Sequence, residues 1–273
     1  MNKLFTFILS ILLISASTVF AQDQTIGVKE KLPKEVLSSS NDLKVLIIPF
    51  EEKMYFSEFD REIADTENIN FNEIRNQFRK GIDTSLYGNL LSDYDVINML
   101  RKHPDFERDL ERIYGGITYN YEEVPLREQA ESLPGKAVKA TKSVRKPVET
   151  SKEDKIVEGQ LVSSSDNKDK YMAAIITDKE LLPYLNEKYS ADYFIFINQL
   201  DIKRNSKSTS YDLEADEFLK DIKIHFTILN SKGERVASGL SATAIPSKEN
   251  TIYSYLLKGI KPATAQIAKL LTP

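Results

Sequence analysis

The stretch of sequence that decides the fold is Tyr193-Phe194-Ile195-Phe196-Ile197-Asn198-Gln199-Leu200-Asp201-Ile202. It is the most apolar segment beyond the first twenty or so residues of the chain. A nearly continuous apolar run of this length is typical of a strand that is covered on both faces. We therefore expect it to lie at the centre of a sheet.

Shorter patterns on either side of this segment supply the rest of that sheet. Leu43-Lys44-Val45-Leu46-Ile47-Ile48-Pro49-Phe50 predicts a buried strand that ends at a proline, and residues 94–100 predict a second, short strand. Apolar and polar residues alternate over 222–228, and a tight turn at 230–233 leads into a partner strand over 235–245. Alternation over 117–125 predicts an added edge strand.

Segments in which apolar residues recur at helical spacing lie between these strands. Asn70 and Glu73 predict a capped helix start. An apolar face follows at Phe71, Ile74, Phe78, Ile82 and Leu86, and Arg75, Arg79, Lys80 and Asp83 take the other side. Further helices are predicted over 102–114, around 181–189 and from about 251, with Pro183 and Pro262 disturbing the last two. The sequence thus predicts an α/β fold, a single mixed β-sheet of about five strands flanked by helices.

The amino-terminal residues predict that the protein is exported. Lys3 precedes a short apolar run, and Val19-Phe20-Ala21 precedes polar residues, so residues 1–21 have the form of a signal peptide that is cleaved after Ala21. We expect residues 22–42 to be an exposed leader and 43–273 to be one α/β domain. Residues 127–169 lose all periodicity and predict a flexible insertion, whose basic part is 136–155. The expected location is periplasmic or secreted.

Composition narrows the classes of function. The chain has 37 basic and 41 acidic residues and no cysteine, so we expect no nucleic-acid partner and no disulfide. No transmembrane segment is predicted beyond the signal. The sequence predicts no catalytic residue, no cofactor and no metal site, and a count of two histidines with no metal-ligand spacing agrees with that expectation.

Four segments resemble a known group of envelope domains. They are Val45 to Phe50, Tyr94-Asp95-Val96-Ile97, Ala191 to Ile197, and the turn region from Asn230 to Gly239. The pattern resembles the anticodon-binding-like α/β domain of the curli-secretion channel subunit, of the lipoprotein activators of penicillin-binding proteins, and of the amino-terminal domain of TolB. The resemblance covers about 43–100 and 171–271 and implies binding to other envelope proteins. It brings no site residue, and Gln22 stands where a lipid-bearing cysteine would follow the signal.

Two functional hypotheses follow. The first is a non-enzymatic protein-binding or assembly module of the bacterial cell envelope, with an envelope protein as partner. Five aromatic residues are its contact candidates, namely Tyr55, Phe56, Phe59, Tyr119 and Tyr121, with packing on the sheet edge as the alternative. The second is an exported, hydrolase-like enzyme with a polar site near Asp201 and His225, where His225 is predicted to lie on an exposed strand face. The sequence does not predict an oligomeric state.

Overall fold

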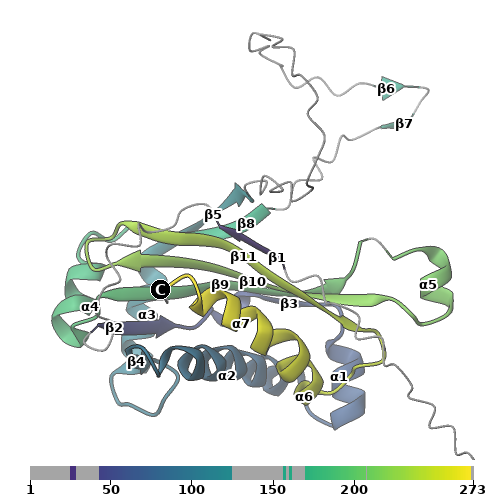
Figure 1. Cartoon of the computed structure of the whole chain (residues 1–273), viewed down its shortest axis with the longest axis horizontal. Coiled ribbons are helices and arrows are strands. Elements are labelled where there is room, and N and C mark those ends of the chain that lie inside the picture. Colours follow the sequence, from purple (N-terminus) through teal and green to yellow (C-terminus); the bar gives the residue numbers. More distant parts are fainter. Residues whose placement is uncertain are drawn as a thin grey trace, which may run out of the picture.

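The computed structural model describes residues 25–28, 43–124, 156–157, 160–161, 170–206 and 208–271. Figure 1 shows a long, twisted sheet with helices along one face and a short two-stranded ribbon on the other. The predicted signal peptide, most of the leader and most of the insertion lie outside the described residues. Within the described part of the chain, no helix is both long and apolar enough to cross a bilayer.

The main sheet is mixed, which confirms the predicted fold class. Its strand order is β1-β11-β10-β9-β2-β4, and β3 pairs with the far half of β9. The strands are β1 (Thr25–Val28), β2 (Lys44–Ile48), β3 (Tyr55–Ser57), β4 (Asp95–Asn98), β9 (Tyr193–Arg204), β10 (Leu219–Asn230) and β11 (Arg235–Pro246). β2 runs parallel to β4 and β9, and β3 also runs parallel to β9. The pairs β9–β10, β10–β11 and β11–β1 are antiparallel. The stretch 193–202 is central, as predicted.

Successive residues of the central strands serve different cores because side chains alternate between the faces of a sheet. Val45 and Ile47 lie in the core beneath one face, and Leu46 and Ile48 lie in the core beneath the other. The first face carries α2 (Phe71–Leu90) and the C-terminal helical segment (Figure 1). The second carries α3 (Phe106–Gly115) and α4 (Leu181–Tyr189).

The second face also carries a ribbon that the sequence does not predict. Within the part of the chain that the structure describes, β5 (Ile117–Glu123) pairs with β8 (Lys170–Ile176) alone, and the two form a separate antiparallel sheet. The predicted edge strand over 117–125 therefore exists but does not extend the main sheet. Its partner strand begins at Lys170, directly after the predicted insertion, where no strand is predicted from the sequence. The ribbon adds a layer over β9, β10 and β11 (Figure 1).

Local signals explain where the helices begin and end. The Asn70 side chain accepts a hydrogen bond from the Glu73 backbone at 2.9 Å, which confirms the predicted cap. Pro183 lies in the first turn of α4, where backbone N–H groups have no helical partner in any case, so the helix begins at Leu181 and continues through the proline.

The C-terminal helical segment is irregular just before Pro262. It consists of α6 (Ile252–Ser254), a π-helical turn over Tyr255–Ile260 and α7 (Lys261–Ala268). The sequence predicts a break at Pro262, but the helical segment continues through this residue as α7, so the break does not occur. Instead, the turn just before the proline is wider than an α-helical turn, which accommodates a residue that has no N–H.

Several short elements fall in segments that the sequence treats as irregular. β1 lies within the predicted leader, and its four residues pair with Ala242 to Gly239 of β11. A 3₁₀ turn (Glu52–Met54) and α1 (Asp60–Glu67) fall within the charged stretch after β2. α5 (Ser210–Glu214) forms the tip between β9 and β10. β6 (Ile156–Val157) and β7 (Gln160–Leu161) pair inside the predicted insertion, most of which lies outside the described residues.

Candidate functional site

The five aromatic contact candidates differ in exposure. Phe59 packs in the core beneath the Lys220 ammonium group, which lies 4.5 Å from its ring centroid. Tyr55 and Tyr119 are half-buried against the core. Phe56 is 43% exposed and Tyr121 is 55% exposed. The packing alternative therefore holds for Phe59, and only Phe56 and Tyr121 present large exposed rings.

Phe56 and Tyr121 flank the polar residues of the second functional hypothesis. Phe56 of β3 is paired in register with Asp201 of β9, so the two side chains share a face of the sheet. The Tyr121 hydroxyl donates to Gln199 Oε1 at 3.2 Å, and Gln199 Nε2 donates to Asp201 at 2.8 Å. The structure thus brings members of both predicted sites together on the face that holds the ribbon.

His225 is buried beneath that ribbon, so the prediction that it lies on an exposed strand face is wrong. It is 2% exposed because β8 crosses over β10 at this position. Its Nδ1 accepts a hydrogen bond from the Met172 backbone N–H at 2.9 Å, so the proton of the neutral ring lies on Nε2. Nε2 donates to Asp201 Oδ2 at 3.2 Å. Both ring nitrogens are therefore engaged within the fold.

The polar layer around His225 anchors the ribbon to the sheet. A β-bulge places Asn198 between the residues of β9 that pair with His225 and Phe226. Asn198 Nδ2 donates to the Met172 carbonyl oxygen at 2.8 Å, and Thr227 Oγ1 accepts from the Ala174 backbone N–H at 3.0 Å. Side chains of the main sheet thus satisfy the edge of β8 that does not face β5.

Burial by itself would raise the pKa of Asp201, but its hydrogen bonds with His225 and Gln199 outweigh that effect. The pKa of this carboxyl group lies below its usual range, and Asp201 is ionised at neutral pH. An ionised Asp201 holds the His225 ring in the tautomer that can accept the Met172 N–H. The pair therefore serves as a structural connection between sheet and ribbon.

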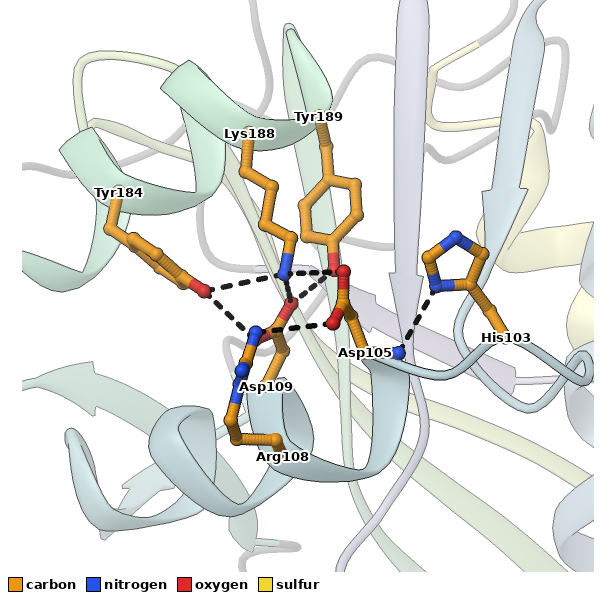
Figure 2. A network of polar contacts seen from close by, with 7 residues as sticks. All are labelled: His103, Asp105, Arg108, Asp109, Tyr184, Lys188 and Tyr189. Carbon is orange, nitrogen blue, oxygen red and sulfur yellow. Dashed lines mark hydrogen bonds and ion pairs between the residues drawn. The ribbon is translucent and has the colours of Figure 1, made fainter.

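A second polar network fastens α3 to α4 (Figure 2). Asp109 of α3 is buried and accepts from Lys188 Nζ at 2.6 Å and from the Tyr184 hydroxyl at 2.8 Å. The Tyr189 hydroxyl donates to the same carboxylate, and Asp105 pairs with Lys188 at 3.3 Å. The Asp109 carboxylate takes its donors from three residues of α4, namely Tyr184, Lys188 and Tyr189, so the arrangement is that of a helix-to-helix connection. Among the described residues, no three His, Asp or Glu side chains gather where they could share a metal ion.

A hollow in the described surface lies elsewhere, between α2 and the C-terminal helical segment. It measures about 740 Å³, and we call it the α2 groove. It is lined by Gln77, Lys80, Gly81, Thr84, Ser85, Gly88, Asn89, Tyr253, Leu256, Leu257 and Lys261. Small residues of α2 form one wall, and apolar side chains of the C-terminal segment form the other. These two segments lie side by side on the helical face of the sheet (Figure 1).

The α2 groove combines exposed apolar side chains with a single sign of charge. Tyr253 is 70% exposed and Leu257 is 42% exposed. The only charged residues in the lining are Lys80 and Lys261, in a chain whose formal net charge is −4. Leu256 approaches α2 so closely that a Cβ atom at Gly81 would lie 2.2 Å from Leu256 Cδ2, so any larger residue at position 81 would require the Leu256 side chain to shift. The groove can accept an apolar occupant that carries negative charge at its edges.

Sequence reasoning missed the α2 groove because its walls are more than 160 residues apart in the chain. One signal was present: Gly81, Thr84, Ser85 and Gly88 recur at helical spacing on one side of α2. Small residues at that spacing allow another element to approach closely, but they do not identify it.

The fold and the α2 groove define a class of protein, a mixed α/β domain with a groove between surface helices. No family model matches the chain, and no curated protein matches it. Among solved structures it is similar to the PelC dodecamer from Paraburkholderia phytofirmans, with a TM-score of 0.36, 7% identity, and coverage of 92% of this chain and 99% of that one. A variant of the same dodecamer gives a TM-score of 0.35 and 7% identity, covering 91% and 98% of the two chains. Likeness at this level does not establish a shared function.

Proposed function

We propose that this chain is an exported, non-enzymatic binding module of the bacterial cell envelope. In this proposal the signal peptide is cleaved after Ala21, and the α/β domain binds a partner protein in the periplasm. The occupant of the α2 groove is an acidic, amphipathic helix of that partner. The observation that supports this function best is the groove itself, which exposes Tyr253 and Leu257 between two lysines and contains no acidic residue in its lining.

The chemistry of the groove favours a helix of this kind. A helix that lies in a groove presents apolar residues at positions i, i+3, i+4 and i+7. The apolar wall of Tyr253, Leu256 and Leu257 matches such a stripe, and Lys80 and Lys261 match carboxylates that flank it. The group of envelope domains that the sequence resembles also acts by binding proteins. Phe56 and Tyr121, on the opposite face of the sheet, are proposed as a second contact surface.

A defined peptide tests the groove directly. A helical peptide with leucines at i, i+3, i+4 and i+7 and glutamates beside them is titrated into the protein of residues 22–273, and fluorescence anisotropy gives its Kd. We expect it to bind at least tenfold more tightly than the same peptide with lysines in place of the glutamates. Equal affinity for the two peptides would contradict the charge argument.

Variants locate the binding. Tyr253→Ala and Leu257→Ala each remove an exposed apolar anchor, and we expect each to raise the Kd of the acidic peptide about tenfold. Phe71→Ala and Leu213→Ala remove side chains of similar exposure that do not line the groove, and should leave the Kd unchanged. Phe56→Ala and Tyr121→Ala test the second surface in the same assay. Loss of binding in Phe71→Ala or Leu213→Ala instead would show that the peptide does not bind in the groove.

A further inference from the structure

A smaller cavity lies on α2 next to the groove, at the carboxyl end of β4. It measures about 210 Å³ and is lined by Lys80, Asp83, Thr84, Tyr87, Asn98, Leu100 and Arg101. The carboxyl ends of parallel strands are where α/β sheets commonly hold ligands, and β4 runs parallel to β2. At about 30 Å³ for each molecule of liquid water, the cavity has room for a ligand of several heavy atoms.

Asp83 is the unusual member of this lining. The sequence pattern places it on the solvent side of α2, yet it is 1% exposed. Among the described residues, neither of its carboxyl oxygens has a hydrogen-bond partner. A buried polar group without a partner costs free energy and calls for an explanation, such as a bound molecule.

The charges around Asp83 indicate the sign of that molecule. Arg79 and Lys80 lie on α2 and Arg101 follows β4, so three cations surround the carboxyl group. From α3, the nearby titratable group is the Tyr114 hydroxyl, which accepts a hydrogen bond from Arg79. Burial raises the pKa of Asp83 to about 8, although the charge of Arg79 acts in the opposite direction. At neutral pH the carboxyl group is therefore protonated, and the lining carries only positive charge.

A protonated Asp83 can donate a hydrogen bond into the cavity. The Asn98 amide nitrogen and the Thr84 hydroxyl are further donors in the lining, because Asn98 Oδ1 already accepts from the Leu100 backbone at 2.9 Å. Lys80 and Arg101 supply charge-assisted donors at the mouth. A set of donors with net positive charge is suited to an anion with several acceptor oxygens.

We propose that this cavity binds a small oxyanion, a carboxylate or a phosphate, through Asp83, Asn98 and Arg101. The cavity adjoins the α2 groove and shares Lys80 and Thr84 with it, but neither Asp83 nor Arg101 lines the groove, so variants at these two residues test the cavity alone. The bound oxyanion accepts the Asp83 proton in a hydrogen bond and rests against the Arg101 guanidinium group.

Titrations with sodium acetate and with inorganic phosphate test the proposal. Backbone and side-chain amide NMR signals of Asn98, Leu100 and Arg101 are followed at about pH 6 and about pH 9.5, on either side of the Asp83 pKa. We expect saturable shifts confined to these residues at the lower pH and at least tenfold weaker binding at the higher pH. The relative affinities of acetate and phosphate identify which oxyanion the cavity prefers.

Two variants distinguish a binding site from a purely structural cavity. Asp83→Asn keeps a neutral donor at every pH, so binding should persist and lose the part of its pH dependence that comes from Asp83. Arg101→Gln removes an exposed cation that stacks on Tyr87. We expect it to weaken the binding of both acetate and phosphate at least tenfold while the protein stays folded. No saturable shift with either anion at pH 6 would overturn the proposal, as would equal binding to the wild-type protein at both pH values.

Discussion

Asp83 and Asp109 are both buried, yet their surroundings shift their pKa values in opposite directions. Asp109 loses water on burial but gains hydrogen bonds from Lys188, Tyr189 and Tyr184, and these hold its pKa below the usual range. Asp83 loses water as well, and its interactions with Arg79, Asn98 and Arg101 only partly offset that loss, so its pKa rises to about 8. The same residue type therefore stabilises one helix pair and opposes folding at the other site when it ionises.

Asp83→Asn tests the second half of that contrast. The folded-state pKa of Asp83 lies above its unfolded value, so the wild-type protein loses stability as the pH rises from about 4 to about 8, by about 1.4 kcal/mol per pH unit. The asparagine variant has no such loss. We expect it to match the wild-type protein in urea unfolding near pH 4 and to exceed it by a few kcal/mol near pH 8. A difference that does not change with pH would contradict the assignment.

Asp109→Asn tests the first half. The folded-state pKa of Asp109 is lowered, so its contribution is complete above about pH 4 and is lost as the pH falls below that value. At neutral pH we expect the variant to lower the free energy of unfolding by about 2 kcal/mol, because charge-assisted hydrogen bonds from three donors weaken. Asp105→Asn, at the exposed edge of the same network, is the matched control and should cost less than about 1 kcal/mol. An equal effect of the two substitutions would refute the central role of Asp109.

Among the secondary-structure elements, β8 is held in an unusual way. One edge pairs with β5, and the other is satisfied by side chains of the main sheet rather than by a strand. Thr227→Val keeps the shape of the side chain but removes the acceptor of the Ala174 N–H. We expect a loss of about 1–3 kcal/mol and faster hydrogen exchange at the Ala174 amide.

A buried threonine on the other face of the sheet is the control for that substitution. Thr243 donates to the Gly259 carbonyl oxygen at 3.1 Å, and Thr243→Val should destabilise the protein without faster local exchange at Ala174. Unchanged exchange at Ala174 in Thr227→Val would show that the side-chain hydrogen bond does not hold the ribbon.

Elements with a regular local pattern could be predicted from the sequence. The strands at 44–48 and 193–204, the hairpin after 219 and the long helix after Asn70 follow from apolar runs, alternation and capping. β8 was not predicted, although its apolar run from Tyr171 to Ile176 is long enough for a buried strand. A run of this kind does not reveal its partners, which come from β5 and from the main sheet. The resemblance to anticodon-binding-like domains stays a prediction.

The candidate site was predictable only in part. Exposed rings at Phe56 and Tyr121 and a polar cluster around Asp201 follow from residue types, but the burial of His225 depends on the ribbon. Helical periodicity assigned Asp83 to the solvent side, because it reports the angle of a residue around a helix and not what packs there. The end of β4 and the residues that follow it, including Asn98 and Leu100, cover that side of α2.

At the scale of the whole molecule, the proposed function requires that the protein is exported and that it binds a partner. The basic start, short apolar run and Val19-Phe20-Ala21 exit predict that the periplasmic form begins at Gln22. Intact mass spectrometry and amino-terminal sequencing of protein from osmotic-shock fractions should give this start. A cytoplasmic species that retains Met1 would contradict the proposed location in the cell envelope. The proposals for the groove and the cavity do not depend on that location.

The most direct measurement of the central claim is site-specific photo-crosslinking in intact cells. A photoreactive phenylalanine analogue is placed at position 253 in the α2 groove, or at position 71 as the control, which is exposed at the start of α2 and does not line the groove. The account predicts one discrete adduct from position 253 only, with the crosslinked peptide of the partner rich in glutamate or aspartate and in leucine at helical spacing. The same adducts from both positions, or a crosslinked peptide without acidic residues, would contradict it.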